Sequence, residues 1–404
     1  MIHFIATSRL PMFRLAAAFV ILATAASGFA AELEKVDLFH GDIGGYKSYR
    51  IPGIVVTKGG TVLAYCEARK AGSDWAAIDI LLRRSTDGGK TWGEPMEIAD
   101  VPGPKARNPV ALERKLGGED DVTYNNPVMI ADRSGAVHLL YCLEYMRCFH
   151  CRSDDDGKTW GKPVEITATA FEPLKKRHNW KVIATGPGHG IQLKGGRLVV
   201  PVWLSLGTGG SGHGASVTAT VVSDDGGRSW QPGEVAIPST DEWDSPNEAT
   251  VAELSDGRVM LNARSPSKAN RRLVTTSPDG LTAWEEPRFD DALPEPVCMG
   301  SLLAIPDKKA LLFSNPDNLE KAGAKAPPAP GSGRDRRNLT VRLSEDDGKT
   351  WSTKRTIEGG FSAYSDLTSQ KDGTVLLFYE RAGEKRGLGR LTVARFPLDW
   401  LKEQ

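Results

Sequence analysis

Short apolar runs separated by glycine-containing turns recur along most of the chain. Residues 54–56 precede the turn at Gly59-Gly60, and residues 62–64 follow it. Similar turns recur at Ser134-Gly135, Gly195-Gly196, Asp256-Gly257, Asp307-Lys308 and Asp372-Gly373. An apolar run, a short turn and a second apolar run are typical of a β-hairpin. The pattern therefore predicts six hairpins.

A repeat of eight residues alternates with these hairpins. Its first copy covers residues 85–92, with the sequence STDGGKTW. Three further full copies begin at Ser153, Ser223 and Ser344, and a degenerate copy begins at Ser277. Ser and Asp side chains bond local backbone in turns, and Gly adopts the positive φ that such turns need. We expect these repeats to have a structural function.

The alternation of the two repeats predicts about four strands in each unit. The residues from 31 to 404, divided among six units, give roughly 62 residues per unit, which suits a propeller blade with loops. We therefore predict an all-β fold, a six-bladed β-propeller of four-stranded antiparallel blades. Residues 391–396 or the N-terminal run 36–39 would supply the outer strand of the sixth blade. A β-sandwich or a β-helix would not explain the alternation.

The first thirty residues have a different pattern. Arg9 and Arg14 come before or at the start of an almost wholly apolar run, residues 15–26, and small residues follow at Gly28 and Ala30. This order is typical of a secretory signal peptide, and the run is short for a membrane-spanning helix of about 20 residues. We predict a signal peptide at residues 1–30, a propeller domain at residues 31–404, and a secreted or periplasmic protein without stable membrane insertion. A membrane anchor is the alternative.

Charge excludes one class of partner. The chain has 51 Lys and Arg residues against 51 Asp and Glu residues, so its formal net charge is zero. Removal of residues 1–30 takes away Arg9 and Arg14 and leaves a slightly acidic protein. A nucleic-acid-binding protein would show a basic excess, so we expect no nucleic-acid partner. The balance leaves room for a local charged site.

The five cysteines are too few for a disulfide framework in a chain of this length. Cys148 and Cys151 form a CxxC motif, but no second CxxC accompanies it to complete a zinc site. We therefore predict no metal site. In an oxidising compartment, a disulfide between Cys148 and Cys151, or between Cys142 and Cys151, is an alternative.

The positions of the turns predict which residues face each other in the hairpins. Three facing pairs result, each at the end of its hairpin away from the turn: Arg50 with Arg69, Glu248 with Arg264, and Tyr364 with Glu380. In a propeller those ends share one rim. Charged and hydroxyl groups on one rim predict a small-molecule site walled by the blades.

The segment Tyr49-Arg50-Ile51-Pro52 resembles the arginine motif that opens sialidases, and the eight-residue repeats resemble the Asp-boxes of that family. Four further segments also resemble sialidase counterparts, in the family's order: Ser73-Asp74-Trp75, Asn247-Glu248, Asn262-Ala263-Arg264 and Ala363-Tyr364-Ser365. The resemblance covers essentially all of the chain after the first thirty residues. It implies a retaining exo-α-sialidase, a glycoside hydrolase that removes terminal sialic acids.

The resemblance also implies roles for particular residues. Tyr364 would be the nucleophile, Glu248 the base that takes its phenolic proton, and Asp74 the acid/base for the leaving oxygen. A phenol with a pKa near 10 needs such a partner at neutral pH. A neutral nucleophile suits this substrate, because a carboxylate would repel the carboxylate of a sialic acid.

Arginines would bind that substrate carboxylate, since a guanidinium pairs with it through two hydrogen bonds and stays charged. The resemblance places this role on Arg50, Arg264 and Arg336, with Arg69 as a supporting residue of the same group. Arg334 and Arg337 flank Arg336 and are the alternatives for the third position. The chemistry requires no metal and no cofactor.

The expected partners are sialylated glycoproteins, glycolipids or oligosaccharides. Within the same class of enzyme, a trans-sialidase or a glycosidase for a related nonulosonic acid is an alternative. A lectin-like propeller that binds sialylated glycans without cleaving them is an alternative from another class. Such a lectin would be expected to lack Tyr364, Glu248 or Asp74, and all three are present.

Overall fold

The computed structural model describes residues 1–2, 32–321, 323, 334–383 and 389–403. The folded unit is described from Glu32 onwards. Nearly all of the predicted signal peptide lies outside the described residues and stays a prediction. In the part of the chain that is described, no helix has both the length and the apolar character needed to cross a membrane.

Five sheets make up the described part of the folded unit, and their strands are antiparallel except for one short pair. The first sheet holds β2 (Ser48–Val56), β3 (Val62–Arg69), β4 (Ile78–Ser85) and β5 (Met96–Glu97). The second holds β6 (Tyr124–Ala131), β7 (Val137–Leu143), β8 (Arg147–Ser153) and β9 (Val164–Glu165), with β11 (Gly188–His189) parallel to β6.

The third sheet holds β10 (Val182–Thr185), β12 (Ile191–Gln192), β13 (Leu198–Thr208), β14 (Gly214–Ser223) and β15 (Gln231–Ile237). The fourth holds β16 (Ala249–Glu253), β17 (Val259–Ala263), β18 (Arg271–Ser277) and β19 (Arg288–Pro294). Helical segments are short: α1 (Pro109–Arg114), α2 (Thr167–Ala170) and the 3-10 turns Glu172–Lys176, Pro306–Lys308 and Leu398–Leu401.

The fifth sheet has seven strands, because one long strand passes through it. Its members are β20 (Ser301–Ile305), β21 (Ala310–Pro316), β22 (Arg337–Ser344), β23 (Thr353–Ser369), β24 (Thr374–Ala382), β25 (Gly389–Pro397) and β1 (Glu34–His40). The first part of β23 pairs with β22 and its last part pairs with β24. Both predicted outer strands are present, since β25 pairs with β24 on one side and with β1 on the other.

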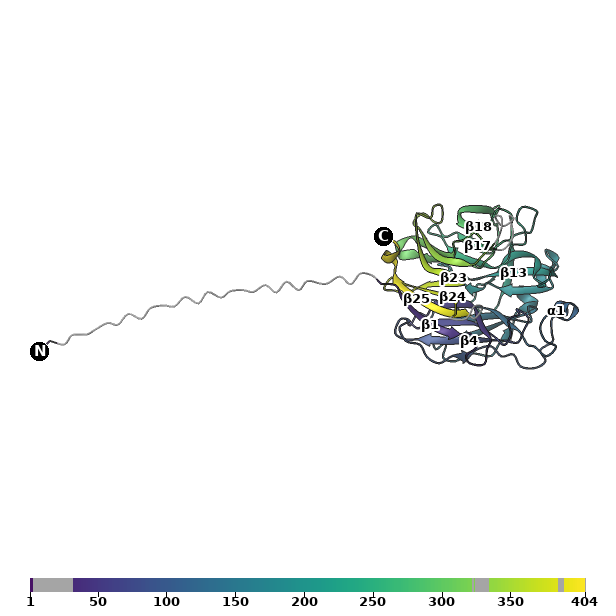
Figure 1. Ribbon diagram of the computed structural model, residues 1–404, viewed down its shortest axis with the longest axis horizontal. Coiled ribbons are helices and arrows are strands. Elements are labelled where there is room, and N and C mark those ends of the chain that lie inside the picture. The colour runs from purple at the N-terminus through teal and green to yellow at the C-terminus, as the bar shows by residue number, and fades with distance from the viewer. Residues whose placement is uncertain (3–31, 322, 324–333, 384–388, 404) are drawn as a thin grey trace. The chain divides into compact units, whose positions relative to one another are not determined.

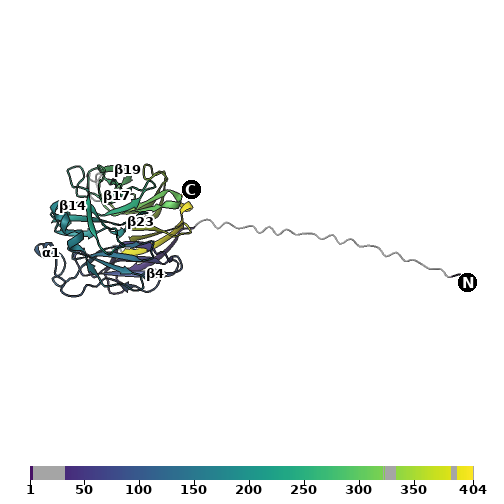
Figure 2. The same ribbon diagram turned by 180° about the vertical axis from the view of Figure 1, so that it is seen from behind.

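The sheets follow one another in chain order around the folded unit (Figure 1, Figure 2). Strands of successive sheets contact each other in a closed circuit, from β2 through β6, β12, β16, β20 and β23 back to β2. This confirms the all-β, propeller-like prediction. The count of six blades stays a prediction, because hydrogen bonding continues without a break through β23.

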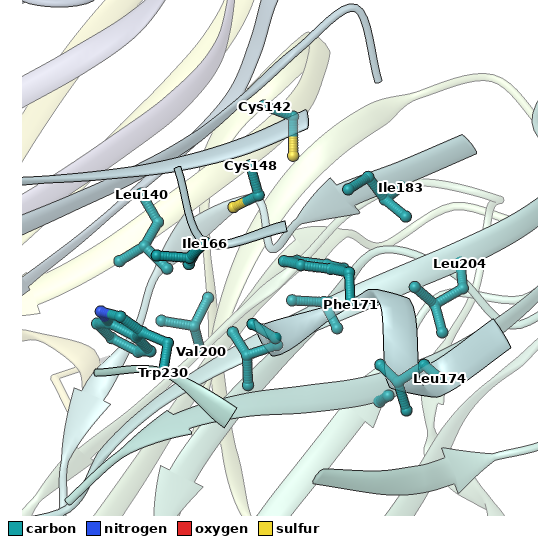
Figure 3. Close-up of a cluster of buried hydrophobic side chains, with 14 of the residues drawn as sticks. Leu140, Cys142, Cys148, Ile166, Phe171, Leu174, Ile183, Val200, Leu204 and Trp230 are labelled. Carbon is teal, nitrogen blue, oxygen red and sulfur yellow. The ribbon is translucent and has the colours of Figure 1, made fainter. Parts of the chain in front are cut away.

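The core lies between neighbouring sheets. Figure 3 shows one cluster, in which Leu140, Cys142 and Cys148 of the second sheet pack against Ile183, Val200 and Leu204 of the third. Alternate residues of a strand point to opposite faces, so each sheet buries both faces against its neighbours. The eight-residue repeats close the outer turns: Ser85 donates to Asp87 at 2.7 Å, and Asp87 accepts from the Thr91 hydroxyl at 2.6 Å.

One of the three predicted facing pairs is wrong. Arg50 pairs with Glu67, and Arg69 pairs with Ser48, because a bulge interrupts the register between Arg50 and Gly53. Pro52 has no N–H to donate, and Ile51 has a φ of 59°, so the ladder cannot continue regularly there. The other pairs hold. Arg264 N–H donates to the Glu248 carbonyl at 2.9 Å, and Glu380 faces the bulge that contains Tyr364.

Candidate active site

Tyr364 lies where β23 passes from β22 to β24. The register of β23 against β24 shifts between Ser362 and Ser365, so the backbone is bulged at Tyr364. The side chain is 4% exposed. Its hydroxyl donates to the carboxylate of Glu248, at 2.6 Å from Oε1 and 2.7 Å from Oε2. The predicted nucleophile and the predicted base are therefore in direct contact, although 116 positions separate them.

Arg264 joins the same contact from β17's end. Its Nη1 donates to the Glu248 carboxylate and, at 2.6 Å, to the Tyr364 hydroxyl oxygen. The hairpin of β16 and β17 brings Arg264 beside Glu248, as the turn at Asp256-Gly257 predicts. A carboxylate and a guanidinium thus meet at one phenol oxygen.

Two further guanidiniums lie over the Tyr364 ring. The Arg50 Cζ is 5.0 Å from the ring centroid, and the Arg336 Cζ is 5.2 Å from it. Arg50 donates from Nε and Nη2 to Glu380, at 3.1 and 3.3 Å. Arg336 comes directly before β22, and its Nη2 donates to the Val297 carbonyl at 2.8 Å. The three arginines predicted to bind a carboxylate therefore gather around Tyr364.

Of the arginines after the Pro- and Gly-rich stretch, Arg336 lies over the Tyr364 ring. Arg337 donates instead to Glu320 at 2.7 Å, in an exposed ion pair. The two side chains point to different surroundings because they are adjacent at the start of a strand. Most of the Pro- and Gly-rich stretch itself lies outside the described residues.

Electrostatics keep the Tyr364 phenol protonated. Burial raises its pKa most, and although Arg264 opposes this, Glu248 raises the pKa further. The net pKa lies above the ordinary value near 10. The phenol therefore needs a base within hydrogen-bond reach to react as an oxygen nucleophile, and Glu248 occupies that position.

Asp74 lies in the loop after β3, beside this group, with its side chain 40% exposed. Its Oδ1 is 2.6 Å from Nη1 of Arg69 and 3.9 Å from Nη1 of Arg50. Burial favours the neutral acid, but Arg69 and Arg50 outweigh burial and hold the pKa of Asp74 below its usual range. These arginines therefore favour the Asp74 carboxylate, which has no proton to donate.

Arg69 is paired with a residue that the sequence analysis missed. Arg69 is 1% exposed and donates from Nε and Nη2 to Glu67, at 2.9 and 2.6 Å. Glu67 also accepts from the Asn126 N–H at 2.8 Å. Glu67 precedes Arg69 by two positions on β3, so their side chains share a face; that spacing was the signal.

An aromatic group backs the Asp74 loop and was also missed. The Trp75 indole donates to the Ser211 carbonyl at 2.8 Å. Its ring centroid is 4.7 Å from that of Tyr145 and 5.4 Å from that of His213. Trp75 is 2% exposed, so the residue next to Asp74 is anchored while Asp74 itself is accessible.

Among the described residues, no group of three or more His, Cys, Asp or Glu side chains is arranged to hold a metal ion. His189 belongs to a different region. Its Nδ1 is 2.7 Å from Oδ1 of Asp366, and it lines a cavity of about 360 Å³ together with Val55, Ile130 and Leu254. By contrast, the groups around Tyr364 are arginines and carboxylates from several sheets.

A comparison with known families shows to which family this chain belongs. Residues 60–377 match the BNR repeat-like domain. The chain belongs to the BNR repeat-like family. This BNR repeat-like chain is also 31% identical, over 389 residues, to a sialidase of Micromonospora viridifaciens, with 88% of the chain and 52% of that relative covered. The resemblance to sialidases is thus confirmed, and the chain spans about half the length of that relative.

Solved structures agree with this relationship. The BNR repeat-like chain is similar to the Hadza microbial sialidase, with a TM-score of 0.68, 27% identity, and 88% of this chain and 67% of that one covered. It is also similar to the intramolecular trans-sialidase from Ruminococcus gnavus in complex with oseltamivir carboxylate. There the TM-score is 0.69, the identity is 18%, and 91% of this chain and 98% of that one are covered. The second likeness concerns the fold.

Proposed function

We propose that the protein is a retaining exo-α-sialidase that hydrolyses terminal sialic acids of glycoproteins, glycolipids or oligosaccharides. The observation that carries the proposal is the hydrogen bond from the Tyr364 phenol to Glu248 among three arginines. Similarity to sialidases over 88% of the chain supports the substrate class.

Charge in the site matches a substrate with one carboxylate. Four arginines face three glutamates and one aspartate there: Arg50, Arg69, Arg264 and Arg336 against Glu67, Glu248, Glu380 and Asp74. The charges of these eight side chains therefore balance while Asp74 is ionised. A substrate carboxylate would bring the same charge that Asp74 supplies.

The balance of charges explains how Asp74 could become a proton donor when the substrate binds. A substrate carboxylate bound by Arg50 would weaken the attraction of that arginine for Asp74, 3.9 Å away, and would itself repel a second carboxylate. Both effects raise the pKa of Asp74. Substrate binding would thus favour the protonated acid in the complex, although the arginines by themselves favour the carboxylate.

The reaction then proceeds in two displacements. The Tyr364 oxygen attacks the anomeric carbon and gives its proton to Glu248, while the leaving oxygen takes a proton from Asp74. Water, activated by the Asp74 carboxylate, next displaces Tyr364, which recovers its proton from Glu248. Two displacements retain the configuration. Sialidases are known exceptions to the usual pair of carboxylates in glycosidases, so the tyrosine role follows from the family as well as from the contact.

Incubation of the purified protein with a reporter sialoside tests the proposal. Release of free sialic acid, with the α-anomer formed first in proton NMR, is the expected result. No release over a range of pH and linkages would refute the proposed sialidase activity. Binding without release would favour a lectin. An anhydro sugar or a transferred sugar as product would indicate a trans-sialidase. Preference for another nonulosonic acid would mean that the proposed substrate is wrong.

We also propose that residues 1–30 are a signal peptide and that the protein is secreted or periplasmic. The charged start, the apolar run and the small residues near Ala30 support this. The mass of the protein recovered from the exported fraction tests it. A chain that keeps residues 1–30 in that fraction would contradict the proposal.

A further inference from the structure

Cys142 and Cys148 lie directly opposite each other on β7 and β8. Both side chains are fully buried, and both belong to the cluster between the second and third sheets. Figure 3 shows the two side chains in that cluster. Residues directly opposite in an antiparallel pair project to the same face, so their Cβ atoms are close.

The backbone of Cys148 shows which kind of cross-strand pair this is. Its N–H donates to the Thr167 hydroxyl at 2.9 Å, and its carbonyl accepts from the Ile166 N–H at 2.9 Å. Both groups therefore point away from β7, so Cys142 and Cys148 form a non-hydrogen-bonded pair. In such pairs the Cα atoms are about 4.5 Å apart, which lies within the roughly 4.4–6.8 Å that a disulfide spans.

The two thiols also interact. Burial raises the pKa of the Cys148 thiol, and a hydrogen bond with the Cys142 side chain adds to this effect. Cys151 faces elsewhere. It is three positions after Cys148 and packs in a different cluster, between the first and second sheets. The geometry thus disfavours both pairings that the sequence left open.

We propose that Cys142 and Cys148 are joined by a disulfide when the chain folds in the presence of a small-molecule or protein disulfide as oxidant. In the reaction one thiolate attacks the oxidant disulfide and releases one of its sulfurs as a thiol. The second cysteine then attacks the mixed disulfide and releases the other sulfur. The chain loses two protons and two electrons in total, and the oxidant becomes two thiols.

The disulfide would lie beside the turn of the β7–β8 hairpin, which supports the candidate active site. The tip of this hairpin carries Glu144 and Tyr145, both with positive φ. Glu144 pairs with Arg107 at 3.2 Å, and Tyr145 packs on Trp75 beside Asp74. The cross-link would therefore limit opening of the hairpin behind the Asp74 loop.

The test is a refolding experiment on the whole chain. Protein unfolded in urea with a reductant is refolded with a mixture of reduced and oxidised glutathione, and its thiols are then counted in denaturant. We expect three thiols where the reduced chain has five, and a proteolytic peptide that links Cys142 to Cys148. Five remaining thiols, a link to Cys151, or glutathione attached to either cysteine without the cross-link would overturn the proposal.

Two variants sharpen the result. Cys142→Ser should keep all four of its remaining thiols, and Cys142→Val serves the same purpose if a buried hydroxyl prevents folding. Cys151→Ser is the matched control and should fall from four thiols to two. If Cys142→Ser loses two thiols, or if Cys151→Ser loses none, the proposal is wrong.

Discussion

The Tyr364 hydroxyl donates to both carboxylate oxygens of Glu248, at 2.6 and 2.7 Å. Tyr364 belongs to the fifth sheet, and Glu248 directly precedes the first strand of the fourth. The contact therefore depends on how two sheets pack, which no hairpin determines by itself. It gives the proposed reaction its nucleophile and its base before any substrate arrives.

Tyr364→Phe should lower kcat by about 10³-fold or more, because it removes the attacking oxygen and keeps the ring over which Arg50 and Arg336 lie. Release of a reporter from an aryl sialoside measures this. Tyr379→Phe is the matched control, since Tyr379 is buried on β24 and donates to Glu358. Equal turnover in Tyr364→Phe and wild type would refute the nucleophile.

Arg336→Lys should lower kcat/KM for a sialoside by roughly 10- to 100-fold, the effect of losing one charge-assisted hydrogen bond. Arg336 suits this test because its described hydrogen bond goes to the Val297 carbonyl, so substitution leaves no carboxylate of the site unpaired. Arg337→Lys, in the exposed pair with Glu320, should leave kcat/KM unchanged. A larger loss in Arg337→Lys than in Arg336→Lys would reverse the assignment.

Binding of free sialic acid near neutral pH should take up protons. Arg69 and Arg50 hold the pKa of Asp74 below its usual range, and a bound carboxylate would raise it. Calorimetric titration in buffers with different ionisation enthalpies measures the uptake, and Asp74→Asn should abolish it. Uptake that persists in Asp74→Asn, or no uptake in the wild type, would contradict the proposed coupling between substrate and acid.

Stability should fall as the pH drops from about 6.5, the usual pKa of histidine. Burial, aided by His138 and Arg152, lowers the pKa of His150 to about 3 in the folded state. His138 also contacts Asp132, at 3.1 Å, and burial lowers its pKa as well. Between the two pKa values the unfolded chain binds more protons, so acid favours unfolding.

Urea unfolding at pH 7.5 and pH 5 tests this dependence. His150→Phe should lose less stability than the wild type over that interval, because one group that gains a proton on unfolding is gone. Val137→Ala, a change on β7 that removes no titratable group, should keep the dependence of the wild type. The interpretation fails if His150→Phe and the wild type respond equally to acid.

Much of the fold could be predicted because the turns are local. The hairpin at Asp256-Gly257 brings Glu248 beside Arg264 from spacing alone, since its ladder is regular. The bulge at Ile51-Pro52 could not be counted in this way, and it replaced the expected neighbour of Arg50 by Glu67. The proline was the available warning, because it cannot donate to a ladder.

The contacts between sheets could not be predicted from local spacing. The Val297 carbonyl that holds Arg336 and the stacking of Trp75 on Tyr145 both depend on distant segments. The same holds for the state of Asp74. Its role was assigned by resemblance, but its ionisation depends on Arg69 and Arg50 in their folded positions.

The pairing of β1 with β25 ties the beginning of the folded unit to its end. During synthesis the ribosome releases β1 more than 300 residues before β25, so the earliest strand must wait for the latest one. Until then, one edge of β1 and one edge of β24 lack their partners and are open to pairing with other chains. We therefore expect nascent or truncated chains that lack β25 to need chaperone protection, whatever the stability of the sheets already formed.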